Sequence, residues 1–207
     1  MFRWLLVLLL SALLGSAPAR ADAPMERGFA TASRPLLADP ADAKSRLGQV
    51  FVATPVAVLE RRGGLARVRV EGWHQDGADR LLYALQGKRI RRAILKKDST
   101  GILTRLDSLT DPATGQLWHR VAFEAWTDAR HLAPAADPLW EEAEMLFSTR
   151  CTSCHERRIP HKYTANQWVG LLKVMGPRTG LPKDKQQLIL KFLQFRAKDT
   201  RDLPAGD

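Results

Sequence analysis

The sequence predicts an α+β protein in which a β-rich first half is followed by a helical second half. Between residues 49 and 132, short apolar and β-branched runs such as 50–53 and 67–70 alternate with turn residues. Small residues and prolines then gather at 133–138, where we expect a boundary. From Asp137 onward, apolar residues recur at helical spacing.

The strands of the first half predict a small β-barrel. In residues 67–70 basic and apolar side chains alternate, so one face of the strand can be buried while the other faces water. Residues 67–73 end in Glu-Gly-Trp, and residues 120–126 echo them with Glu-Ala-Trp. A strand pair that closes on Gly-Trp resembles bacterial SH3-like domains, so we expect an SH3-like barrel over residues 22–132. We interpret Trp73 and Trp126 as core anchors rather than as a binding platform.

Three helices are predicted within residues 133–207. Asp137 can cap the first, with Pro138 at its first helical position. Thr164 and Gln167 have capping-box spacing and open the second helix. Pro182 starts the third helix. The apolar face of this helix is broad and comprises Leu188, Ile189, Phe192, Leu193 and Phe195.

The chain has two cysteines, and both lie in the C-x-x-C-H run formed by Cys151, Cys154 and His155. This run is the attachment signature of c-type haem. Two thiols three residues apart can form thioethers with the two vinyl groups of one porphyrin, and the histidine then supplies the proximal iron ligand. We therefore predict one covalent haem c.

Other interpretations of the cysteine pair are a disulfide, a thioredoxin-like dithiol and half of a zinc site. A zinc site is short of ligands because only His161 stands nearby. A thioredoxin motif would follow a strand, whereas helical patterns flank this pair.

Met175 is the candidate distal haem ligand. It lies at the end of the second helix, from which it can reach the face of the haem opposite His155. His161 is the alternative, because a six-residue link can cross from one face to the other. We interpret Met145 as a packing residue. A His/Met pair raises the reduction potential and suits electron transfer, and no acid or base is evident beside Met175, so we do not expect an enzyme.

Residues 1–21 predict a Sec signal peptide, with Arg3, an apolar stretch over 4–14 and an Ala19-Arg20-Ala21 cleavage site. An uncleaved anchor is the alternative. Cleavage would place the protein in the periplasm without stable membrane insertion and lower the formal charge from +10 to +8. A basic surface can steer the protein onto an acidic partner. The lysines and arginines are scattered and form no nucleic-acid-binding motif, so we do not expect binding to nucleic acid.

Several stretches resemble the monohaem C-terminal half of pentahaem c-type cytochromes, which carry electrons to periplasmic trimethylamine N-oxide or S-oxide reductases. The stretches are 72–77, 87–90, 137–141, 151–155, 163–168, 172–175 and 197–200. The resemblance implies that Cys151 and Cys154 attach haem, that His155 is the proximal ligand and that Met175 is the distal ligand.

This sequence carries no counterpart of the tetrahaem half of that family, with its four further C-x-x-C-H runs and its membrane anchor. We therefore expect a soluble shuttle that receives electrons from a quinol-oxidising membrane cytochrome and passes them to a reductase, possibly a molybdoenzyme. The alternative function is a haem-based redox sensor or adaptor that binds a partner protein through its β domain.

Overall fold

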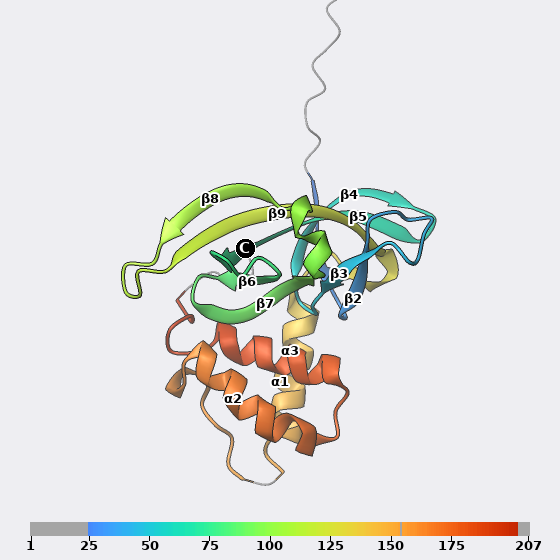
Figure 1. Cartoon of the computed structure of the whole chain (residues 1–207). Helices are drawn as coiled ribbons and strands as arrows, with labels where there is room; N and C mark the ends of the chain where they lie inside the picture. Colours follow the sequence, from blue (N-terminus) through green and yellow to red (C-terminus); the bar gives the residue numbers. More distant parts are fainter. Residues whose placement is uncertain (1–24, 154, 203–207) are drawn as a thin grey trace, which may run out of the picture.

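The computed structural model describes residues 25–153 and 155–202 and shows a β-rich half beside a helical half, which confirms the α+β class (Figure 1). The predicted signal peptide lies outside the described residues. No helix within the described ranges is long and apolar enough to cross a membrane.

One antiparallel sheet contains all ten strands found in the described residues, in the order β10-β1-β4-β5-β6-β7-β3-β2-β9-β8. Strand β5 also pairs along its whole length with β9, so the pairings run from β5 through β6, β7, β3, β2 and β9 back to β5. The strands are β1 (Glu26–Ala30), β2 (Arg34–Leu37), β3 (Arg46–Val50), β4 (Pro55–Arg62), β5 (Leu65–Gln75), β6 (Leu81–Leu85), β7 (Lys88–Leu95), β8 (Thr104–Thr110), β9 (Leu117–Asp128) and β10 (Leu132–Ala133).

The alternation read from the sequence decides which face of β5 is buried. Val68 and Val70 are fully buried, while the arginines between and beside them are partly exposed. The two Glu-small-Trp segments lie on the paired strands β5 and β9, where Trp126 is buried and Trp73 is half-buried. The predicted role as a core anchor therefore fits Trp126 better than Trp73.

The helical half consists of α1 (Asp137–Arg150), α2 (Ala165–Met175) and α3 (Lys183–Phe195). Thr164 and Gln167 form the predicted capping box: the Gln167 amide N–H donates to Thr164 Oγ1 and the Thr164 amide N–H donates to Gln167 Oε1. The predicted cap of α1 is wrong by one residue, because Ala136 is the N-cap and makes no side-chain hydrogen bond. Asp137 is instead the first helical residue, where its charge favours the helix N-terminus.

Two hydrophobic cores lie within the described residues. The first, the sheet core, is built entirely from residues of the β half, including Val68, Val70 and Leu82. The second, the helical core, unites the three helices with side chains from the β half. These contributions from the β half are Phe29, Val52, Ala53, Ala84 and Ile90. The helices therefore bury their apolar faces partly against the sheet.

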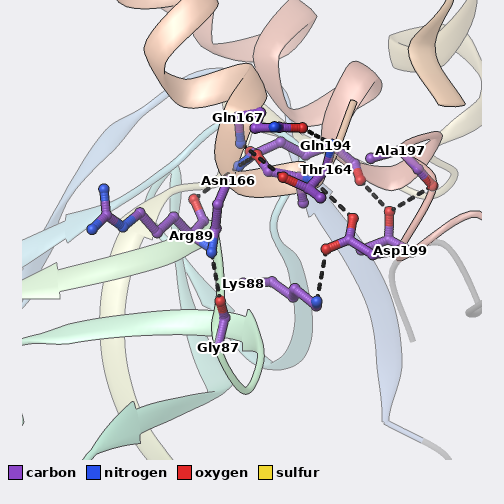
Figure 2. A network of polar contacts seen from close by, with 11 residues as sticks. Gly87, Lys88, Arg89, Thr164, Asn166, Gln167, Gln194, Ala197 and Asp199 are labelled. Carbon is purple, nitrogen blue, oxygen red and sulfur yellow. Dashed lines mark hydrogen bonds and ion pairs between the residues drawn. The ribbon is translucent and has the colours of Figure 1, made fainter. Parts of the chain in front are cut away.

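Polar contacts fasten the β6–β7 turn to the start of α2 (Figure 2). The Asn166 amide donates to the Gly87 carbonyl oxygen at 2.8 Å and accepts from the Arg89 backbone N–H at 2.8 Å. Asp199 bridges the same regions, accepting from Lys88 Nζ at 2.7 Å and from the Ala165 amide at 2.8 Å. Asn166 thus satisfies one backbone acceptor and one backbone donor at this turn and ties the turn to α2.

Lys191 of α3 is buried against the sheet. Its Nζ donates to the Val52 carbonyl oxygen at 2.6 Å and to Thr54 Oγ1 at 3.1 Å. Thr54 Oγ1 donates its own proton to the Arg92 carbonyl oxygen, so it is available as an acceptor for Lys191. Burial lowers the pKa of Lys191 well below its usual value, and the neighbouring Arg92 and Arg91 act in the same direction.

Candidate haem-attachment site

Cys151 is positioned by the end of α1. It is the C-cap residue, and its amide N–H donates to the Phe147 carbonyl oxygen at 3.3 Å. Its side chain is half-buried against the helical core, and this burial raises the pKa of the thiol. Cys154, the second predicted attachment residue, lies outside the described residues.

His155 follows on an exposed segment. Its Nδ1 lies 2.7 Å from the Glu156 carbonyl oxygen. Because a carbonyl oxygen only accepts, Nδ1 is the donor in this contact, and the neutral imidazole that makes it has its lone pair on Nε2. A histidine whose second nitrogen is tied to a backbone carbonyl is a common arrangement for a metal ligand.

Met175 is the last residue of α2 and packs, half-buried, against the same helical core as Cys151. His161, the alternative ligand, lies exposed in the short helix Pro160–Lys162. Met145 does not pack as predicted: 51% of it is exposed, because it lies on the face of α1 away from the core residues Leu139, Ala143 and Phe147.

Buried contacts position the link that follows the C-x-x-C-H run. Trp168 is fully buried, and its Nε1 donates to the Pro160 carbonyl oxygen at 3.0 Å. The Arg158 guanidinium donates to the Tyr163 hydroxyl at 2.5 Å, and the Tyr163 ring meets Trp168 edge-on. Sequence reasoning missed these contacts, although a buried tryptophan usually finds an acceptor for its N–H.

The residues present fit a haem c in their donor chemistry. A half-buried thiol, an imidazole with a free ring nitrogen and a half-buried thioether are the donors that such a group takes. Within the described helical half, the exposed large apolar side chains are Met145, Ile159 (40%) and Val174 (60%), each within six residues of one of these donors. Haem is a large apolar surface that could cover such side chains.

Comparison with known proteins agrees with this chemistry. A family model described as the TorC third cytochrome c domain matches residues 24–132. The cytochrome c-type protein TorC of Escherichia coli K12 is 30% identical over 175 residues, which is 84% of this chain and 45% of TorC. A TorY protein of Escherichia coli O157:H7 is 30% identical over 162 residues, or 75% of this chain and 43% of TorY. No solved structure matches.

These matches cover the two halves differently. The segment matched by the family model contains no cysteine. The match to TorC covers 175 of the 207 residues. It therefore includes residues 151–155 whether it begins at the first residue of the chain or ends at the last. The chain spans less than half the length of these curated relatives.

A C-x-x-C-H run, here beginning with the C-cap residue of α1, is the signature of the c-type cytochromes. The chain belongs to the TorC family, through the domain described as the third cytochrome c domain.

Proposed function

We propose that this chain is a periplasmic cytochrome with one haem c that carries single electrons towards a terminal reductase. The observation that carries the proposal is the placement of Cys151 and Met175 on one core cluster, from two different helices. When bound, haem c would be attached through Cys151 and Cys154, would be ligated by His155 and Met175, and would supply a one-electron centre.

The surrounding residues would keep these donors in place during electron transfer. Trp168 holds the link between His155 and α2 through its bond to Pro160, and the capping box fixes the start of the helix that ends at Met175. Donors held by packed elements change position little when a charge is added or removed. Such rigidity suits a carrier.

The partners we propose are a quinol-oxidising membrane cytochrome as donor and a periplasmic N-oxide or S-oxide reductase, a molybdoenzyme, as acceptor. The resemblance and the TorC and TorY relatives support this choice. We propose further that the circuit of strands from β5 through β9 is an SH3-like barrel that serves as a docking module. The signal-peptide pattern supports export, and mass spectrometry of the exported protein should show a chain that begins at Asp22.

Rapid mixing of the reduced, matured protein with an N-oxide reductase tests the carrier function. We expect haem oxidation in the presence of N-oxide, at a rate that falls as salt is raised, because the formal charge is strongly positive. Met175→Ala should slow the reaction by at least about tenfold, because iron that has lost its thioether ligand would change its ligation as it changes charge, whereas Met25→Ala, an exposed methionine of the β half, should leave it unchanged. Equal effects of the two variants would exclude Met175 as ligand.

A second function, redox sensing, is favoured by one observation. The helical core includes Val52 and Ile90 of the β half. A change in haem ligation that altered the packing of the helices would therefore also alter their contacts with the β half. Affinity for a partner that depends on the oxidation state, without turnover, would favour the sensor over the carrier.

A further inference from the structure

Strand β7 lies next to the helical half (Figure 1). Residues of β6, β7, α2 and α3 line a cationic groove between the two halves. Its volume is about 550 Å³, and residues from both halves of the chain line it. The basic side chains in its wall are Arg89, Arg91, Lys173 and Lys183, and the wall contains no aspartate or glutamate.

The charges of the groove are not neutralised within the described structure. Arg89, Lys173 and Lys183 are exposed, and none of their side chains takes part in an ion pair there. Arg91 is half-buried with its guanidinium 4.6 Å from the centre of the Phe51 ring, and burial lowers its pKa. A carboxylate brought from outside would find in Arg91 a cation that has already lost part of its hydration.

The buried amine of Lys191 lies near one basic residue of the groove wall, Arg91. Lys191 lies close enough to Arg91 and Arg92 for both to disfavour its protonated form. An anion in the groove would relieve this mutual repulsion of like charges.

Apart from Gln186 and Gln187, the remaining wall is largely apolar, which distinguishes the groove from a merely basic surface. Leu81, Tyr83, Leu172 and Leu190 contribute to it. A second hollow of about 560 Å³ shares Leu81, Tyr83 and Arg89 with the groove, so the concave surface continues along β6 and β7. Aromatic and arginine side chains in a concave apolar setting are typical of protein interfaces.

We propose that the groove binds an acidic segment of a redox-partner protein that also carries apolar side chains. This inference rests on the proposed carrier function, because a partner is required, and it specifies where that partner docks. The groove borders α2, the helix that ends at Met175, so docking there places the partner against the element that holds the candidate distal ligand.

Calorimetric titration of the holoprotein with a synthetic peptide of alternating glutamate and leucine tests the proposal. We expect binding that weakens with salt, and a Lys173→Glu/Lys183→Glu variant should bind about tenfold more weakly, since two attractive contacts become repulsive. The matched control is Lys44→Glu/Arg105→Glu, which makes the same change of net charge on exposed residues away from the groove. Equal losses in the two variants would overturn the proposal.

A second peptide, with serine in place of leucine, tests the apolar wall. It should bind about tenfold more weakly, because the apolar area it could bury is lost. Equal affinity of the two peptides, or no binding of the first at millimolar concentration, would overturn the proposal. Peptide binding requires no electron transfer, so the two proposals can fail separately. A protein that binds the peptide but never reduces a reductase would refute the carrier function and still support the groove as a binding site.

Discussion

The two hydrophobic cores differ in how far each depends on the rest of the molecule. The sheet core draws only on residues of the β half, whereas the helical core also uses five residues of that half. Cys151 and Met175 pack against the helical core, and the segment matched by the family model holds the sheet core. The helical core, beside which the candidate haem site lies, therefore depends on side chains from the β half, whereas the sheet core contains no residue of the helical half.

Loss of covalent haem attachment should produce the largest effect and should separate the two cores. The Cys151→Ala/Cys154→Ala variant is expected to lose covalent haem completely, because the sequence contains no other cysteine. Hydrogen exchange should then accelerate in α1 and α2, where haem would cover apolar side chains, while β5 and β9 stay protected. Uniform loss of protection across both halves would show that the cores form one cooperative unit.

Two fully buried side chains of the β half offer a matched test of the shared core. Ile90 of β7 belongs to the helical core, whereas Leu82 of β6 belongs to the sheet core. Replacing either by alanine should lower the free energy of unfolding by about 3 kcal/mol. Only Ile90→Ala should also increase the rate of hydrogen exchange in α3. An equal increase in α3 for Leu82→Ala would contradict the distinction between the cores.

Lys191 joins α3 to the β half through a buried amine, and Lys191→Met should lower the free energy of unfolding by about 1–3 kcal/mol because the hydrogen bonds to Val52 and Thr54 are lost. The pKa of Lys191 is lowered in the folded state, so the unfolded chain binds more protons between that pKa and about 10.4. The free energy of unfolding of the wild type should rise with pH across this window. Denaturant titrations at several pH values should show a smaller rise for Lys191→Met, and equal slopes would contradict burial of the amine.

A smaller effect is expected at Asp199, which joins Lys88 to the start of α2. Burial alone would raise the pKa of Asp199, but hydrogen bonds from Lys88 and the Ala165 amide outweigh it and hold the pKa below its usual value. Asp199→Asn should therefore lower the free energy of unfolding by about 1 kcal/mol at neutral pH. The difference between variant and wild type should vanish as pH falls through the lowered pKa, and a difference that persisted in acid would contradict the assignment.

Local patterns predicted much of this structure, and long-range contacts could not be read from them. The alternation in 67–70, the capping box of Thr164 and the C-x-x-C-H run each depend on residues a few positions apart. The contacts of Asn166 with the β6–β7 turn and of Lys191 with the sheet join residues more than 70 positions apart. Such pairs leave no periodic signal in a single sequence.

The helix α3 illustrates the difference. Its predicted apolar face is buried, but Lys191 and Gln194 are buried as well. The β half provides acceptors for Lys191, and the β half and α2 provide acceptors for Gln194. Gln194 donates to the carbonyl oxygens of Arg89 and Ala165 at 3.1 Å each, so its amide is satisfied in the interior.

The optical spectrum of the periplasmically matured protein, oxidised and reduced, with and without carbon monoxide, tests the central proposal most directly. Ligation by His155 and Met175 predicts low-spin iron, the far-red band of methionine-to-iron ligation in the oxidised form and no reaction with carbon monoxide. High-spin iron or ready binding of carbon monoxide would contradict a closed electron carrier and would show an accessible distal position.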